Sequence, residues 1–278
     1  MQELSREAAE KLVTSIGIPP RPAVVLAVMD EKSKDEPNIK VIADAISRDV
    51  GVAAALLKTV NSPLFGLRCP VSSIPQAVNL LGLRQVSTLV TSLAMKTSLS
   101  TQGIERFWDQ SARIAMLSAW LAGRLGMDRD SAHLFGLFRD AGIPLLMRRF
   151  KDYKDTLRLA NQDTERAFTD VEDECHGMNH AVVGAIVARN WCLPEGLREA
   201  ILRHHDTGLF DGQADSTARI LVALGHLAGQ IECRTLHQQD DREWHRFRES
   251  VLTWLMLGED DVPDLVQEAG SLLLESGM

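Results

Sequence analysis

The sequence predicts an all-α protein. Of its 278 residues, 45% are apolar, which is enough for one large core or two smaller ones, yet only one residue is Tyr. Strands favour β-branched and aromatic residues, whereas here Ala, Leu and Val recur three and four residues apart, as they do on one face of a helix. Prolines, glycines and capping residues divide these runs into helical lengths. We therefore expect helices and no sheet.

In the first part of the chain, capping and breaking residues set the expected helix ends. The first helix covers residues 2–16 and stops at a proline cluster, and a second starts near Pro22. Asn38 can cap a third helix and Asp49 a fourth. The fourth helix ends before Pro63, because proline disfavours helix in the residue that precedes it.

Two further helices are expected before a polar break in the sequence. Ser73 and Gln76 have the spacing of a capping box, and the helix that they begin continues to Gly82. Another helix then runs to about Leu99. The polar residues 101–103 follow, and they indicate a boundary between subdomains.

That boundary divides the chain into expected subdomains of residues 1–102 and 103–278. The second begins with a long stripe of apolar and small residues from Phe107, which predicts a helix that packs closely against its neighbours. The helices expected after this one cover residues 131–149, 153–160, 164–175, 179–191, 194–205, 216–231, 240–257 and 260–274.

Charge and cysteine content narrow the classes of partner. A net charge of −8 argues against a nucleic-acid or anionic-membrane surface, because both need clustered Lys and Arg. The four cysteines show no Cys-x-x-Cys spacing, and the N-terminus lacks the pattern of a secretory signal, so we expect a cytoplasmic protein. The most apolar stretch, residues 80–99, contains Arg84 and Lys96 and predicts a buried helix, with no membrane span.

Five short phrases occur in an order that points to a known family. They are Ile-Pro-Pro-Arg-Pro-Ala at 18–23, Ile-Ser-Arg-Asp-Val-Gly at 46–51, Val-Asn-Ser-Pro-Leu-Phe-Gly at 60–66, Ala-Val-Asn-Leu-Leu-Gly-Leu at 77–83 and Phe-Trp-Asp-Gln-Ser at 107–111. With these phrases the chain resembles HDOD domain proteins, a branch of the HD superfamily of bacterial signalling proteins, over residues 18–206. The resemblance implies two helical subdomains, the second an HD-like helical bundle, and a role in signal transduction more often than in catalysis.

The resemblance also implies a candidate metal site. Active relatives in the superfamily place His and Asp residues on core helices to bind divalent metals that activate water against a phosphoester. Three of these positions are altered here, to Gln110, Arg139 and His226. The positions that the resemblance retains are Asp140, His180, His204 and His205, with Glu172 matched less securely. Arg139 cannot be a ligand, because a guanidinium has only donors and stays protonated.

Two interpretations of these residues stay open. If the head of Arg139 turned to solvent, the four retained residues could still hold one divalent metal ion. Structural roles are the alternative: the two adjacent histidines lie at an expected helix C-terminus, His180 lies at a helix start, and Asp140 could simply pair with Arg139. In the same interpretation, Glu172 belongs to a solvated acidic face.

The favoured functional hypothesis is a non-catalytic signal-transduction module with a degenerate metal site, which binds a signalling protein or a small regulator. No cofactor is expected, and the one candidate ion is a single divalent metal. The alternative is a metal-dependent phosphohydrolase that acts on a nucleotide or a cyclic dinucleotide, with Asp140, His180, His204 and His205 as ligands. A third hypothesis makes Arg139 an anion clamp for a nucleotide, because guanidinium pairs with phosphate in bidentate fashion.

Overall fold

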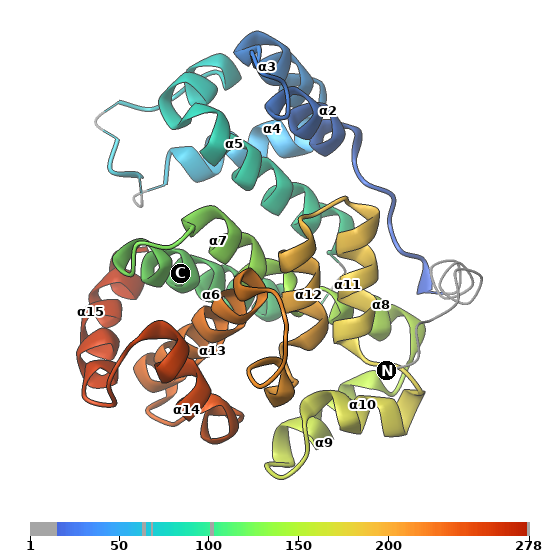
Figure 1. Ribbon diagram of the computed structural model, residues 1–278. Coiled ribbons are helices and arrows are strands. Elements are labelled where there is room, and N and C mark those ends of the chain that lie inside the picture. The colour runs from blue at the N-terminus through green and yellow to red at the C-terminus, as the bar shows by residue number, and fades with distance from the viewer. Residues whose placement is uncertain (1–15, 63–64, 68, 101–102, 277–278) are drawn as a thin grey trace. The chain divides into compact units, whose positions relative to one another are not determined.

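The structure is a computed structural model that describes residues 16–62, 65–67, 69–100 and 103–276 (Figure 1). The helix expected over residues 2–16 lies outside these ranges, apart from its last residue. Within the described residues every regular element is helical, which confirms the all-α prediction. None of these helices is both long enough and apolar enough to cross a membrane. The described residues fall into two compact units, 21–100 with 270–276 and 16–20 with 103–269.

The first unit contains helices whose ends follow the capping residues in the sequence. Asn38 accepts a hydrogen bond from the backbone N–H of Lys40, and Asp49 accepts one from Val52. The longest helix is broken at Gly82, where φ is 75°. The sequence predicts the end of a helix at this residue. The helices are α2 (Ala23–Lys32), α3 (Ile39–Arg48), α4 (Val50–Val60) and α5 (Ile74–Leu99).

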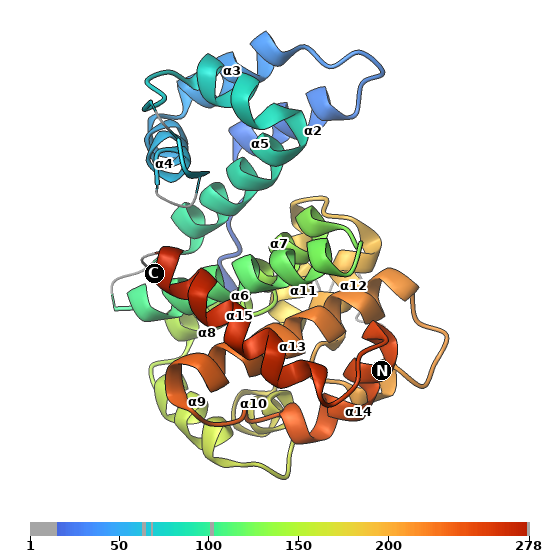
Figure 2. The ribbon, with the colours of Figure 1, turned by 90° about the vertical axis from the view of Figure 1, so that its left-hand side faces the viewer.

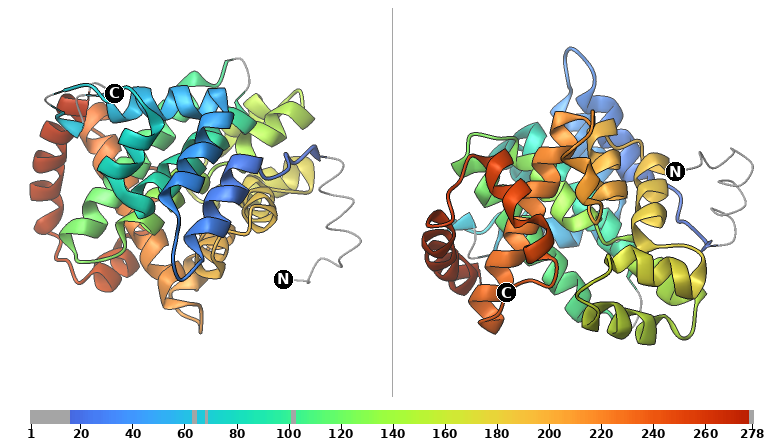
Figure 3. Two further views of the ribbon diagram at one scale, coloured as in Figure 1. Left: turned by 90° about the horizontal axis from the view of Figure 1, so that it is seen from above. Right: turned by 60° about the horizontal axis from the view of Figure 1, so that its bottom comes forward.

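The second unit is a helical bundle that contains every candidate site residue. Its helices are α6 (Glu105–Arg124), α7 (Arg129–Phe138), α8 (Gly142–Arg149), α9 (Tyr153–Gln162), α10 (Phe168–His176), α11 (His180–Asn190), α12 (Glu195–Arg203), the short 3₁₀ helix η2 (Thr207–Leu209), α13 (Ser216–His237), α14 (Trp244–Leu255) and the part of α15 (Asp261–Ser276) that precedes Gly270. Helix α6 lies against α7 and α13 (Figure 2), and α9 lies beside α10 (Figure 3).

Small residues allow α6 and α7 to pack as closely as the sequence predicts. A Cβ atom added to Gly136 of α7 would lie only 2.7 Å from the Cα of Ala115 on α6. Side chains of Cβ-bearing residues do not tolerate such a contact with backbone, so this crossing requires glycine. Because this crossing holds α7 in place, it also sets where the chain leaves the helix after Phe138.

The prediction of a single helix over residues 131–149 is wrong, because the chain forms two helices there. Helix α7 ends at Phe138 and α8 begins at Gly142. A Cβ atom on Gly142 would lie 2.1 Å from the carbonyl oxygen of His180, so the start of α8 touches the start of α11. Pro144 also belongs in a first helical turn, since it has no N–H to donate. The break places Asp140 beside His180.

This close approach predicts that Gly142→Ala destabilises the protein. The added methyl group must push α8 away from the backbone of α11, which should lower the free energy of unfolding by about 2–3 kcal/mol. Gly229→Ala is the matched control, since Gly229 is also buried and helical but its nearest atom to an added Cβ lies at 3.6 Å. Urea unfolding followed by circular dichroism measures both, and equal stability of the two variants would contradict the prediction.

Candidate metal centre

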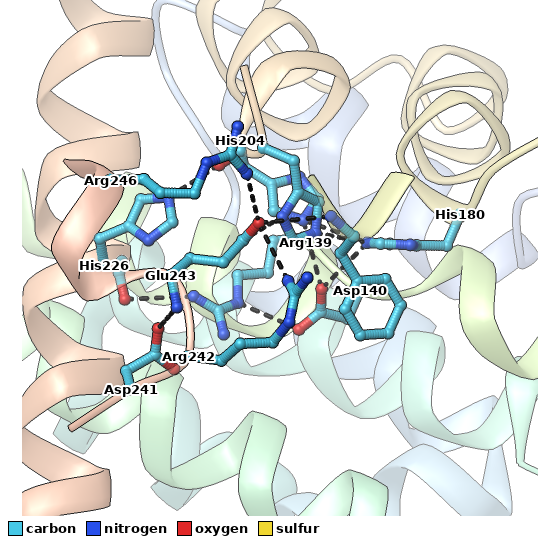
Figure 4. Close-up of polar contacts among 12 residues, drawn as sticks. Arg139, Asp140, His180, His204, His226, Asp241, Arg242, Glu243 and Arg246 are labelled. Carbon is cyan, nitrogen blue, oxygen red and sulfur yellow. Dashed lines mark hydrogen bonds and ion pairs between the residues drawn. The ribbon is translucent and has the colours of Figure 1, made fainter. Parts of the chain in front are cut away.

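Four side chains that the resemblance matched to metal ligands meet at one point in the second unit. Asp140 lies between α7 and α8, and His180 is the first residue of α11. His204 and His205 follow directly after α12. One ligand atom from each of the four lies within 4.8 Å of all the others. Figure 4 shows Asp140, His180 and His204 pointing toward one another. Although adjacent residues of a helix point about 100° apart, both histidines face the cluster because the helix ends at Arg203.

The spacing of the ligand atoms fits a single ion. The Nε2 atom of His180 lies 3.1 Å from that of His205 and 3.2 Å from that of His204. The Oδ1 atom of Asp140 lies 3.4 Å from Nε2 of His180 and 3.3 Å from Nε2 of His204. Tetrahedral ligands bound at 2.0–2.1 Å from a Zn²⁺ ion are about 3.3 Å apart. The residues present therefore fit a mononuclear centre.

Hydrogen bonds on the other side of each imidazole ring fix which nitrogen faces the cluster. Each Nδ1 atom lies against an acceptor, which is the carbonyl oxygen of Ile201 for His204, the carboxylate of Glu172 for His180 and the carboxylate of Glu243 for His205. A carbonyl or carboxylate oxygen can only accept, so each Nδ1 carries the proton and each Nε2 offers a lone pair. Four lone pairs that face one another require a positive charge between them.

In the metal-free protein, a proton on His180 can supply that charge. Burial by itself lowers the pKa of His180, but the Glu172 and Asp140 carboxylates outweigh it and raise the pKa to about 10. The pKa of His204 is lowered to about 3, first by burial and then by its neighbour His205. Asp140 keeps a pKa well below its usual range, because Arg139 and the histidines outweigh the effect of burial.

Glu172 is buried and supports the cluster without joining it. Its Oε2 atom accepts from both the backbone N–H and Nδ1 of His180, and its Oε1 atom accepts from the hydroxyl of Tyr153. The interpretation of Glu172 as part of a solvated acidic face is therefore wrong, although its neighbours Asp173 and Glu174 are exposed. A carboxylate that holds the outer nitrogen of a histidine orients the ring and makes it a better ligand.

Arg139 does not turn to solvent. Its Nε donates to Oδ2 of Asp140 over 3.0 Å, its Nη1 donates to the carbonyl oxygen of Gly225 over 3.1 Å, and its side chain is only 16% exposed (Figure 4). Burial alone would lower the pKa of Arg139, yet the charges of Asp140, Asp241 and Glu243 raise it. The guanidinium therefore holds one oxygen of Asp140 and leaves the other to the histidines.

The two other altered positions have different surroundings. His226 is buried, its Nε2 donates to the carbonyl oxygen of His204 over 2.7 Å, and its ring stacks on Phe247. Burial lowers the pKa of His226 to about 4. Gln110 is exposed and lines a cavity of about 550 Å³ that opens beside the four ligand residues.

Residues between α13 and α14 complete the site, although the sequence pattern did not predict them. Glu243 holds Nδ1 of His205 and also accepts from the backbone N–H of Phe168 and from Nη1 of Arg246. Its pKa is lowered, because the attraction of His205 outweighs the effect of burial. A helix was expected over residues 240–257, but α14 begins only at Trp244. No local pattern near Glu243 indicates that it reaches a histidine 38 residues away.

Comparison with known proteins now assigns the family. The profile of the HDOD domain matches residues 18–207, which is more than half of the chain. The chain belongs to the HDOD family. This confirms the resemblance drawn from the sequence phrases. The HDOD profile ends two residues after His205, so Glu243 lies outside the matched range.

Two curated proteins that are similar to this HDOD protein carry the name of uncharacterized proteins. A protein of Treponema pallidum is 28% identical over 208 residues, which are 70% of this chain and 40% of the relative. The protein YuxH of Bacillus subtilis is 36% identical over 76 residues, which are 27% of this chain and 18% of YuxH. The HDOD chain thus spans less than half the length of either relative.

Solved structures share the fold. An HDOD domain protein of unknown function from Geobacter sulfurreducens has a TM-score of 0.70 at 23% identity and covers 96% of this chain and 94% of its own. A protein of Shewanella amazonensis, provisionally named a phosphohydrolase, has a TM-score of 0.72 at 21% identity, and the match covers 97% of this chain and 96% of that protein. A provisionally named signal transduction protein of Marinobacter aquaeolei has a TM-score of 0.73 at 20% identity, and the match covers 96% of this chain and 60% of that protein. At these identities the likeness concerns the fold.

The contact between Glu172 and His180 predicts that Glu172→Gln weakens metal binding by about tenfold to a hundredfold, because an amide holds the outer nitrogen of the ring less well than a carboxylate. Asp170→Asn, an exposed change on the same helix, is the control and should leave the affinity unchanged. Competition for Zn²⁺ with a chromophoric chelator measures both affinities. Wild-type affinity in Glu172→Gln would contradict the supporting role.

Proposed function

We propose that this HDOD protein is a non-catalytic, cytoplasmic signal-transduction domain that retains one divalent metal site and binds a signalling partner or a small regulator. The observation that carries the proposal is the double attachment of Arg139 to Asp140 and to the carbonyl oxygen of Gly225. The cavity beside the metal centre favours a small regulator over a protein partner, since concave sites of this volume suit small ligands.

Arg139 argues against a binuclear hydrolase. One oxygen of Asp140 accepts from the guanidinium, which leaves mainly the other oxygen for an ion and makes this carboxylate a poorer bridge between two ions. A second divalent ion would also meet the fixed charge of Arg139. At about 4 Å and an effective dielectric of about 20, that repulsion is on the order of 8 kcal/mol.

The four protein donors also favour a role other than catalysis. Structural zinc sites use four protein ligands, whereas catalytic sites leave one position to water. An ion held by Asp140, His180, His204 and His205 would supply Lewis acidity, but these residues alone can fill its shell. Their main effect would then be to hold together the α7–α8 junction, the start of α11 and the end of α12.

One observation favours the alternative of a metal-dependent phosphohydrolase. The four ligand atoms converge beside an open cavity large enough for a nucleotide or a cyclic dinucleotide. An ion that accepted more than four ligands could take water from that cavity. Metal content and turnover must therefore be measured on the same sample.

We expect the wild-type protein from metal-replete cells to contain about one equivalent of Zn, Mn, Fe or Ni and to hydrolyse no phosphoester. Asp140→Ala should lose the metal, because it removes the only anionic ligand of the set. Elemental analysis and an assay with bis(p-nitrophenyl) phosphate measure the two properties. Turnover that Asp140→Ala abolishes would overturn the proposed function in favour of the hydrolase.

Replacement of Arg139 tests whether the side chain at this position decides between one ion and two. Arg139→His removes the guanidinium and adds a ligand beside Asp140, so the metal content should rise from about one equivalent to about two. Arg139→Gln removes the same charge without adding an imidazole and should stay at one equivalent. A single equivalent in Arg139→His would show that other features prevent binuclear binding.

A further inference from the structure

Two cations at the cavity have no acidic partner among the residues that the structure describes. Arg106 and Lys154 both line it, both are exposed, and neither forms an ion pair within the residues that the structure describes. They lie in the first turns of α6 and α9. A helix dipole disfavours positive charge at its N-terminus, so these two residues do not serve the stability of their own helices.

A third cation lies deeper in the same cavity with unused donors. Nη2 of Arg242 donates to the carbonyl oxygen of Arg166 over 2.8 Å, and its guanidinium lies over the ring of Phe168. Its Nε and Nη1 atoms are buried and donate no hydrogen bond to the described residues. Nη1 lies 3.3 Å from Glu243, but that carboxylate is already shared with His205. Buried donors without an acceptor are costly, so an acceptor from the cavity would stabilise this arrangement.

The four carboxylates that line the cavity have other contacts. Asp140 is paired with Arg139, and Glu243 with His205. Asp241 accepts from the backbone N–H of Glu243, and Glu105 accepts from that of Gly103. Within the described residues, none of the four forms an ion pair with Arg106 or Lys154, so these two cations stay available to a ligand.

The cavity also has an apolar wall. Phe107, Met147 and Leu157 line it together with the three cations. Ligand sites of this kind combine apolar side chains, which hold the body of a molecule, with a few charged groups that fix its orientation.

We propose that the cavity binds a small organic oxyanion with a flat or apolar body, whose negative groups meet Arg106, Lys154 and Arg242. A phosphoryl group and a pair of carboxylates share this chemistry, since guanidinium and ammonium groups donate to either. The inference rests on the proposed function, because a sensor must bind its regulator without consuming it.

Calorimetry on the full chain tests the proposal with three probes. Phenylphosphonate carries a dianionic phosphonyl group and no ester bond that could be hydrolysed, isophthalate carries two carboxylates, and benzamide is a neutral molecule of similar shape. We expect at least one of the two anions to bind, more weakly as salt is added, and benzamide not to bind. Binding of the phosphonate alone or of the dicarboxylate alone identifies the oxyanion. Equal binding of benzamide, or no binding of either anion, overturns the proposal.

The double variant Arg106→Ala/Lys154→Ala removes the two exposed cations and should weaken the binding of the anion by about tenfold. Lys151→Ala/Arg189→Ala removes the same charge from exposed positions outside the cavity and should change the affinity less than about twofold. Equal affinities in the two double variants overturn the proposal. Metal content and phosphoester turnover are measured on each sample, so turnover contradicts the proposed function alone, whatever the probes show.

Discussion

The structure of the second unit depends on one electrostatic constraint, which is that four lone pairs face one another in a largely buried site. Nε2 of His180 lies within hydrogen-bond distance of Nε2 of both His204 and His205, one oxygen of Asp140 lies within 3.3 Å of Nε2 of His204, and a positive charge must lie among them. The surroundings are consistent with this demand. Glu172, Glu243 and a backbone carbonyl each hold the outer nitrogen of a ring, while Arg139 holds the second oxygen of Asp140. The cluster thus joins helix ends from distant parts of the sequence.

The sequence predicted much of the fold because short-range signals control helix ends. Asn38 and Asp49 cap helices as expected, and the break at Gly82 follows from the freedom of glycine. The error over residues 131–149 has a tertiary cause. Only glycine fits at position 142, because the carbonyl of His180, a residue far away in sequence, lies against it. Gly142 and Pro144 could nevertheless have indicated the break between the two helices.

The candidate site was predicted in part. The resemblance named the four residues that converge, whereas the amino-acid pattern alone also allowed purely structural roles. The burial of Glu172 could not be predicted from the acidic residues beside it, because consecutive residues of a helix lie on different faces and one can be buried while the next is exposed. Glu243 reaches His205 only through the packing of α13 and α14, which no local pattern encodes.

The buried guanidinium of Arg139 has one more consequence. Acidic groups that surround a metal repel one another once the metal leaves, and many small metalloproteins unfold when it is stripped away. Here part of the neutralising charge is covalently attached to the chain, between Asp140 and Asp241. A chelating agent cannot extract it. Starvation for metal would then leave the domain folded, because Arg139 still neutralises part of the acidic charge at its centre.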